Sequence, residues 1–339
     1  MADLLPYLPA FSAAFFIAAL SLPILRKTLA PYLGDKPTAL KNHAGIIPAV
    51  GGCAVALGFF ASLLMVRFTT HFPTGTLNNL RGIFYGGAII FALGIIDDIR
   101  KPAGLNPYIK MAFQALAAVI LIHYQIRIQF IPGIGSYILT VLWVVGVTNA
   151  LNLFDIMDGL AASQGALAAL AFLVISLPSE FIYVNFAAAA LLGAVLGFWP
   201  YNHSKKLKAF LGDSGSYLLG FLLAALALGT NYSAQNPLGV FAPLIILALP
   251  LFDTLFVSVV RLSKGISPLK GTPDHFPLRL ERFGMKRPAI LLMVAAVTLC
   301  YIALAYAVTK VGVTASVIIY LIVLADLAAF AVFLKWKTK

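Results

Sequence analysis

Residues 81–98 read RGIFYGGAIIFALGIIDD, an apolar run that ends in two adjacent aspartates, Asp97 and Asp98. The run has the length and composition of a membrane-spanning helix. A carboxylate in hydrocarbon costs about 2.5–3.5 kcal/mol on insertion scales, so acids at the rim of a span indicate a functional site. Other acids also lie at or just beyond the ends of apolar segments: Asp155, Asp158, Asp213, Asp253 and Asp274. What they can do together depends on whether they emerge on one side of the membrane.

The whole chain has the composition of a membrane protein. Of its 339 residues, 61% are hydrophobic and 11% are charged, whereas a soluble domain is about 25% charged. About 20 apolar residues cross a bilayer core, and on that measure we expect an all-α, polytopic bundle of about eleven spans. The expected spans are 4–25, 46–66, 82–97, 107–125, 134–153, 159–177, 181–200, 214–231, 238–261, 288–308 and 313–334.

The basic residues sort onto alternate loops. All but four of the 24 lysines and arginines fall in one set of loops, and the exceptions are Arg67, Arg81, Arg127 and Lys310. Because cytoplasmic loops are enriched in these residues, we expect the N-terminus outside and the C-terminus in the cytoplasm. All but three of the 12 acids share the cytoplasmic side, the exceptions being Asp3, Glu180 and Asp326. Clustered acids and bases on one face are what a metal-bridged polyphosphate site requires.

The aspartate pair needs a partner. Two adjacent carboxylates repel each other and persist at a bilayer rim only with a cation, a proton or a basic group. Lys110 and Gln114 follow, four residues apart on one helical face. The alternative is a solvated loop before a helix that starts at Pro107.

A second polar stretch lies inside an apolar segment. Asn149, Asn152, Asp155 and Asp158 recur every three residues and form one stripe on a helix, which Gly159 then breaks. Amides and carboxylates at this density must be paired or line a water-filled site. The alternative to a site is an interhelical hydrogen-bond network.

The third stretch, 210–216, reads FLGDSGS and includes Phe210 and Asp213. Its glycines let the backbone approach a ligand, and the N-terminus of the following helix favours phosphate. A simple helix cap by Asp213 is the alternative.

Two further stretches are candidate parts of the site, and for each the alternative is an ordinary polar loop. One contains Lys41 and His43, and the other contains Asp274, His275 and Arg279.

Across all these stretches the candidate metal ligands are carboxylates, with no thiolates among them. Such ligands favour Mg²⁺, with Mn²⁺ as a substitute, over zinc.

Taken in their order along the chain, from Asp35 to Gly284, these motifs resemble those of the polyprenyl-phosphate N-acetylhexosamine-1-phosphate transferase family, glycosyltransferase family 4. The expected span count resembles its WecA-like branch, which includes undecaprenyl-phosphate GlcNAc-1-phosphate transferases. So does the N-terminal pattern of Asp35-Lys36-Pro37, Lys41, His43, Pro48 and Gly51-Gly52. Two positions depart from the family pattern: Ile156 stands in place of a glycine, and Leu278 in place of a second histidine. The triple histidine of the MraY branch is absent, which weighs against a UDP-MurNAc-pentapeptide substrate.

The resemblance implies transfer of an N-acetylhexosamine 1-phosphate, GlcNAc-1-phosphate first, from a UDP-sugar to undecaprenyl phosphate with release of UMP. The product would start a cell-envelope glycan such as O-antigen or teichoic acid. The chain would be one catalytic domain, 1–339, in the bacterial inner membrane, with its site facing the cytoplasm and loop 262–287 contributing to it. Membrane lipids are expected partners and nucleic acid is not. A homodimer is compatible with the sequence, which leaves the oligomeric state open.

The resemblance also implies roles for single residues. Asp213 and Asp97 would bind Mg²⁺, and Asp97 and Asp98 would position or deprotonate the lipid phosphate. Lys110, His275 and Arg279 would hold the diphosphate. Asn149, Asn152 and Asp155 would shape the nucleotide site, with Phe210 stacking on uracil. Asp158 is expected to be catalytic, and Lys41 and His43 to bind substrate. The rival functions are an MraY-like transferase and a secondary transporter; the sequence shows no internal repeat and places its acids at the rim rather than at the midplane.

Overall fold

The computed structural model describes residues 2–35, 45–70, 75–177, 182–233 and 235–336. The chain divides into two compact units, Met1–Thr230 and Asn231–Lys339. The first unit contains η1 (Ala2–Tyr7), α1 (Leu8–Leu29), α2 (Gly51–Thr69), α3 (Thr76–Ile99), α4 (Pro107–His123), α5 (Ile134–Phe154), α6 (Leu160–Ser176), α7 (Ile182–His203) and α8 (Gly212–Gly229). The second contains η2 (Pro237–Phe241), α9 (Ala242–Ile246), α10 (Ala248–Ser263), α11 (Phe276–Arg282), α12 (Arg287–Val308) and α13 (Val313–Trp336).

The predicted all-α membrane architecture is confirmed. Among the described residues, eight helices are long and apolar enough to cross a membrane, or nine if one bent pair forms a single span. That pair, Pro237–Ile246 and Ala248–Ser263, is bent by 69° where the sequence predicts one continuous span. The helices α4 and α6 are apolar but shorter. The predicted span 46–66 begins later, at Gly51, because Ile47–Pro48 (β2) pairs antiparallel with Gly34–Asp35 (β1).

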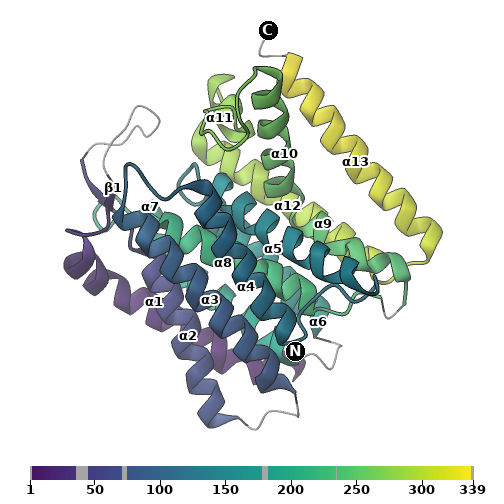
Figure 1. Ribbon diagram of the computed structural model, residues 1–339, viewed down its shortest axis with the longest axis horizontal. Coiled ribbons are helices and arrows are strands. Elements are labelled where there is room, and N and C mark those ends of the chain that lie inside the picture. The colour runs from purple at the N-terminus through teal and green to yellow at the C-terminus, as the bar shows by residue number, and fades with distance from the viewer. Residues whose placement is uncertain (1, 36–44, 71–74, 178–181, 234, 337–339) are drawn as a thin grey trace. The chain divides into compact units, whose positions relative to one another are not determined.

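Helix α8 lies at the centre of the first unit and is buried along nearly all of its length. It packs against α2, α3, α5 and α6, and it is surrounded by other helices in Figure 1. A helix that is apolar on all sides belongs in the interior of a bundle. Its first turn, with Asp213 and Ser214, is therefore held by neighbours rather than by solvent.

Small residues let the helices approach closely at this end of α8. A Cβ atom on Gly94 of α3 would lie 2.3 Å from the Cα of Ser214, and one on Gly52 of α2 would lie 2.3 Å from the backbone nitrogen of Gly215. No side chain fits at either position. The close contact brings the last turn of α3, which carries Asp97 and Asp98, against the first turn of α8.

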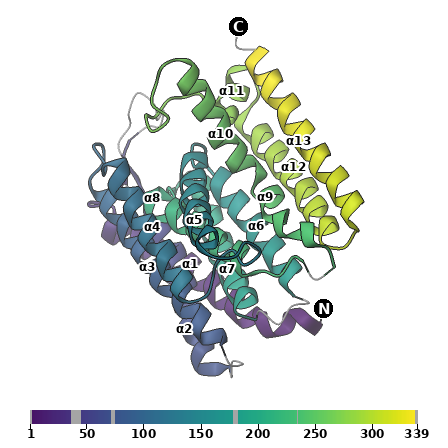
Figure 2. The same cartoon turned by 45° about the vertical axis from the view of Figure 1, so that its right-hand side comes forward.

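The second unit is built on α10, α11 and α12, which contact one another, and α13 packs along α12, as Figure 2 shows. Phe276, at the start of α11, is buried, and its ring contacts Phe252 of α10 and Phe330 of α13. This aromatic contact fixes α11, and with it the loop that precedes it, to α10.

Candidate active site

Asp98 caps the N-terminus of α8 from another helix. Its two carboxylate oxygens accept the backbone N–H groups of Asp213 and Ser214, each over 2.9 Å, and its side chain is 1% exposed. The first N–H groups of a helix have no partner within the helix, and they attract negative charge. The N-cap residue itself, Leu211, offers no side-chain bond. Asp213 therefore lies inside the first turn of α8. The alternative in which Asp213 simply caps this helix is wrong.

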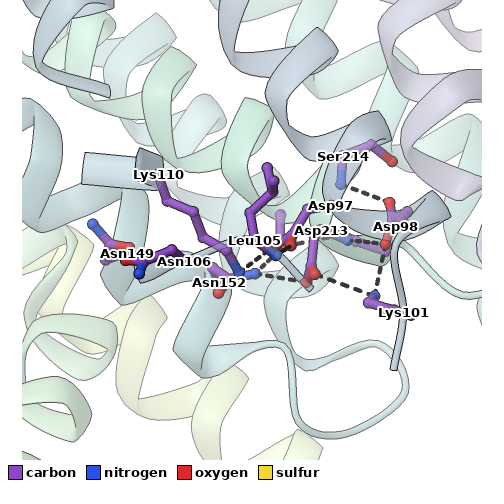
Figure 3. Close-up of polar contacts among 12 residues, drawn as sticks. Asp97, Asp98, Lys101, Leu105, Asn106, Lys110, Asn149, Asn152, Asp213 and Ser214 are labelled. Carbon is purple, nitrogen blue, oxygen red and sulfur yellow. Dashed lines mark hydrogen bonds and ion pairs between the residues drawn. The ribbon is translucent and has the colours of Figure 1, made fainter. Parts of the chain in front are cut away.

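Lys101 joins two of the predicted site acids. Its Nζ lies 2.6 Å from Asp98 Oδ1 and 3.3 Å from Asp213 Oδ2. Burial by itself lowers the pKa of Lys101, but the negative charges of Asp213 and Asp98 outweigh it and raise the pKa above its usual value. The ammonium group therefore stays charged between the two carboxylates (Figure 3).

Asp97 is buried and organises the segment after α3. Its Oδ1 accepts the backbone N–H of Leu105 over 2.6 Å, and its Oδ2 lies 2.5 Å from Lys110 Nζ. Lys110 is placed by the start of α4, where Asn106 accepts the N–H of Tyr108 over 2.9 Å and Pro107 occupies the first turn. The predicted pairing of the diaspartate with a basic group is thus present, with two lysines rather than one.

The amide stripe of α5 divides between two neighbours. Asn152 donates to Asp213 Oδ1 over 3.0 Å and to Ser216 over 2.9 Å, which ties it to the aspartate cluster. Asn149 instead exchanges amide hydrogen bonds with Gln114 of α4, at 2.6 Å and 3.3 Å. The interhelical network that stood as the alternative describes Asn149, while Asn152 contacts the predicted metal ligand.

Asp158 belongs to a second polar group in the first unit. It lies 2.5 Å from Lys208, whose Nζ lies 5.5 Å from the centre of the Phe210 ring. The side chain of Asn202 accepts the N–H of Gly159 and donates to the carbonyl of Ala209 over 2.9 Å. The loop after α5 is therefore fastened to the segment that leads into α8.

The departure from the family pattern at Ile156 puts no strain on the backbone. Asp155 ends α5 as its C-cap residue. Among the described residues, Gln125 is the non-glycine residue with a positive φ, so Ile156 occupies ordinary backbone where the family has glycine. Gly159, which the family motif also has, takes the left-handed conformation with φ of 80°.

In the second unit, the predicted residues form their own cluster. His275 Nδ1 lies 2.6 Å from Asp253 Oδ2. Asp274 accepts hydrogen bonds from Lys264 at 2.9 Å and from Arg279 at 3.1 Å. Burial raises the pKa of Asp274, but hydrogen bonds from Lys264 and Thr272 outweigh burial and hold that pKa below its usual value. Arg279 also donates to the carbonyls of Asp274 and Leu334.

The first unit thus brings together five predicted residues at one end of the bundle: Asp97, Asp98, Lys110, Asn152 and Asp213. Lys41 and His43 lie outside the described residues. Sequence reasoning missed Lys101, Lys208 and Asn202 as members of these groups. Lys101 carries a usable signal, because it stands three residues after Asp98, within side-chain reach at a helix end. Asn202 and Lys208 stand in the polar stretch just before Phe210, but that stretch does not indicate their partners.

The carboxylates of Asp97 and Asp213 suit a hard divalent cation that takes few of its ligands from the protein. In the part of the chain that the structure describes, no group of three or more His, Cys, Asp and Glu side chains could hold a metal ion. Asp97 and Asp213 nevertheless lie side by side (Figure 3). The buried Asp97 Oδ2 has no well-aligned hydrogen bond there and lies 2.5 Å from Lys110 Nζ. Two carboxylates completed by water and phosphate oxygens are a common Mg²⁺ arrangement.

Comparison with known proteins supports the resemblance. The family model described as glycosyl transferase family 4 matches residues 80–231. The chain is 31% identical over 299 residues to the probable undecaprenyl-phosphate N-acetylglucosaminyl 1-phosphate transferase of Bacillus subtilis (strain 168), covering 83% of this chain and 80% of that protein. It is 29% identical over 285 residues to the undecaprenyl-phosphate alpha-N-acetylglucosaminyl 1-phosphate transferase of Escherichia coli (strain K12), covering 79% and 74%. It is 30% identical over 251 residues to the phospho-N-acetylmuramoyl-pentapeptide-transferase of Streptococcus pneumoniae serotype 19F (strain G54), covering 69% and 74%.

Proposed function

Because the chain belongs to glycosyl transferase family 4, we propose that it transfers N-acetylglucosamine 1-phosphate from UDP-N-acetylglucosamine to undecaprenyl phosphate. The observation that carries this function is the similarity to relatives named for that reaction, which extends over most of both chains. Motif residues that are far apart in the sequence also meet at one end of α3 and α8, which gives the reaction a single centre in the first unit.

The reaction brings two anions together. A phosphate oxygen of the lipid forms a bond to the β-phosphorus of the UDP-sugar, and the bond from that phosphorus to the bridging oxygen breaks, so UMP leaves with the electron pair. Positioning and charge neutralisation supply most of the catalysis of phosphoryl transfer. Lys101 and Lys110 are the cations that the site provides for this, and both are already held by carboxylates. Asp97 would accept the proton or orient the lipid phosphate.

We propose Asp97 and Asp213 as the protein ligands of Mg²⁺, which when bound would neutralise the diphosphate charge. Asn152 would keep Asp213 oriented through its hydrogen bond to Oδ1. Asp98 would hold the backbone of the same residue in place.

The topology that accompanies this function has eleven spans, with the bent pair of η2–α9 and α10 counted as one and the shorter α4 and α6 also crossing. The lysine and arginine distribution supports a cytoplasmic C-terminus in a bacterial inner membrane. Asp98 and Asp213 contact each other directly, so the end of α3 and the start of α8 lie at the same membrane face.

A panel of radiolabelled donors tests the function. Purified protein in detergent with undecaprenyl phosphate and Mg²⁺ is expected to give lipid-extractable label and UMP from UDP-N-acetylglucosamine. UDP-N-acetylgalactosamine measures sugar selectivity, and UDP-MurNAc-pentapeptide measures the rival MraY-like activity. Turnover of the pentapeptide donor alone would replace the proposed substrate, and lack of turnover with every donor would contradict the family activity in this chain.

A further inference from the structure

The geometry of the second unit points to Asp253 as the positioning residue of His275. We infer that Asp253 holds the imidazole with the proton on Nδ1, so that Nε2 is the ring nitrogen left to bind a ligand. The inference rests on the proposed function for what Nε2 contacts, but the orientation of the ring rests on this unit alone.

Asp253 contacts two consecutive residues with its two oxygens. Oδ2 lies 2.6 Å from His275 Nδ1, and Oδ1 accepts the backbone N–H of Phe276 over 2.8 Å. His275 is the N-cap residue of α11 and makes no side-chain cap bond of its own. One carboxylate from α10 therefore fixes both the start of α11 and the imidazole ring beside it.

Both side chains in this contact are buried, and this fixes which ring nitrogen carries the proton. The side chain of Asp253 is fully buried and that of His275 is 6% exposed. A buried carboxylate needs a hydrogen-bonded partner, and His275 Nδ1 supplies one. Because Nδ1 faces a carboxylate, it carries a proton, and a neutral ring then presents Nε2 as an acceptor. Within the described residues, Nε2 has no hydrogen-bond partner.

The charged side chains next to His275 in the sequence form bonds with partners other than the imidazole. Asp274 bonds Lys264 and Arg279. Arg279 lies 5.0 Å from the centre of the Phe256 ring and also bonds the Leu334 carbonyl, so its guanidinium holds the loop together. Asp274 thus has the charge of Asp253 and lies in the same unit without bonding the imidazole. It provides a matched control.

The orientation can be measured without activity. In protein labelled with ¹⁵N-histidine, the His275 signals are assigned by their loss in His275→Gln, and they are followed to a pH at which the ring is neutral. Wild-type protein is expected to show the Nδ1–H form. In Asp253→Asn, the amide oxygen can still cap Phe276, while its NH₂ group faces Nδ1 and drives the proton to Nε2. Asp274→Asn should keep the wild-type form. A wild-type Nε2–H ring would overturn the inference even if Asp253→Asn failed to fold.

Activity then tests whether the ring orientation serves the reaction. Loss of the residue that orients a metal-ligating histidine typically costs about 10–100-fold, and we expect a loss of that order in kcat for Asp253→Asn. The double variant with His275→Gln should lose no more than His275→Gln alone, because both changes disable one unit. Multiplicative losses would show that Asp253 acts independently of His275 and would overturn the inference. An inactive wild-type protein with the Nδ1–H ring would contradict the proposed function and leave the positioning intact.

Discussion

The carboxylate of Asp98 holds the backbone of Asp213, a residue 115 positions later in the chain. Their 2.9 Å hydrogen bond joins the last turn of α3 to the first turn of α8. The resemblance gave Asp98 a role on the lipid phosphate, yet both of its oxygens are occupied by backbone N–H groups and Lys101. The contact geometry therefore favours a structural role for Asp98, while the side chain of Asp213 is 23% exposed and is open to a ligand.

This structural role predicts losses of stability of unequal size for truncation of Asp98 and of Asp213. Asp98→Ala leaves two buried N–H groups and one lysine without their partner, and loss of one member of a buried ionic cluster costs about 3–5 kcal/mol. We expect a clearly lowered melting temperature in detergent. Asp213→Ala removes a side chain that is 23% exposed and should lower the melting temperature much less. Equal melting temperatures for the two variants would contradict the structural role of Asp98.

Much of this site could be anticipated from the sequence, and the reason is hydrophobic length. The predicted spans 82–97 and 214–231 fall on α3 and α8 because a bilayer fixes how many apolar residues a helix needs. Acids at the ends of those runs were therefore placed correctly at helix ends.

The partners of those acids could not be derived in the same way. Asn149 and Asn152 are three residues apart, and at 3.6 residues per turn their side chains diverge by about 60°. That divergence sends Asn149 to Gln114 of α4 and Asn152 to Asp213 of α8. Which neighbour each one meets depends on the packing of three helices, which a single periodicity does not encode. The same holds for the capping of α8 by Asp98.

Asp213→Asn should remove turnover and keep the fold. The amide can still accept the hydrogen bond from Asn152, so the contact at 3.0 Å survives, while the charge that would bind the cation is lost. We expect kcat to fall by about 10²–10³-fold, the scale of losing a principal electrostatic group. Asp326→Asn is the control, because Asp326 in α13 bonds Tyr301 and belongs to neither acidic cluster. Full activity in Asp213→Asn would remove this residue as a metal ligand.

Chelation should stop the reaction reversibly. If Asp97 and Asp213 supply only two carboxylates, the cation depends on water and substrate for its other ligands and should exchange readily. We expect EDTA to abolish UMP release, Mg²⁺ or Mn²⁺ to restore it, and Ca²⁺ to restore little, because Mg²⁺ and Ca²⁺ differ in size and coordination. Turnover that persists in EDTA would contradict a divalent cation at this site.

The raised pKa of Lys101 predicts a specific alkaline sensitivity. A lysine whose pKa is higher in the folded state than in the unfolded state stabilises the fold fully below the unfolded pKa, about 10.4. That contribution is lost as the pH rises from there through the folded pKa, when the ammonium between Asp98 and Asp213 loses its proton. Above about pH 10, wild-type protein should therefore lose more thermal stability per pH unit than Lys101→Met, which has no such charge to lose. Lys206→Met, which changes an exposed lysine, should follow the wild-type curve. Parallel curves for wild type and Lys101→Met would show that the two carboxylates do not hold this ammonium group in the folded protein.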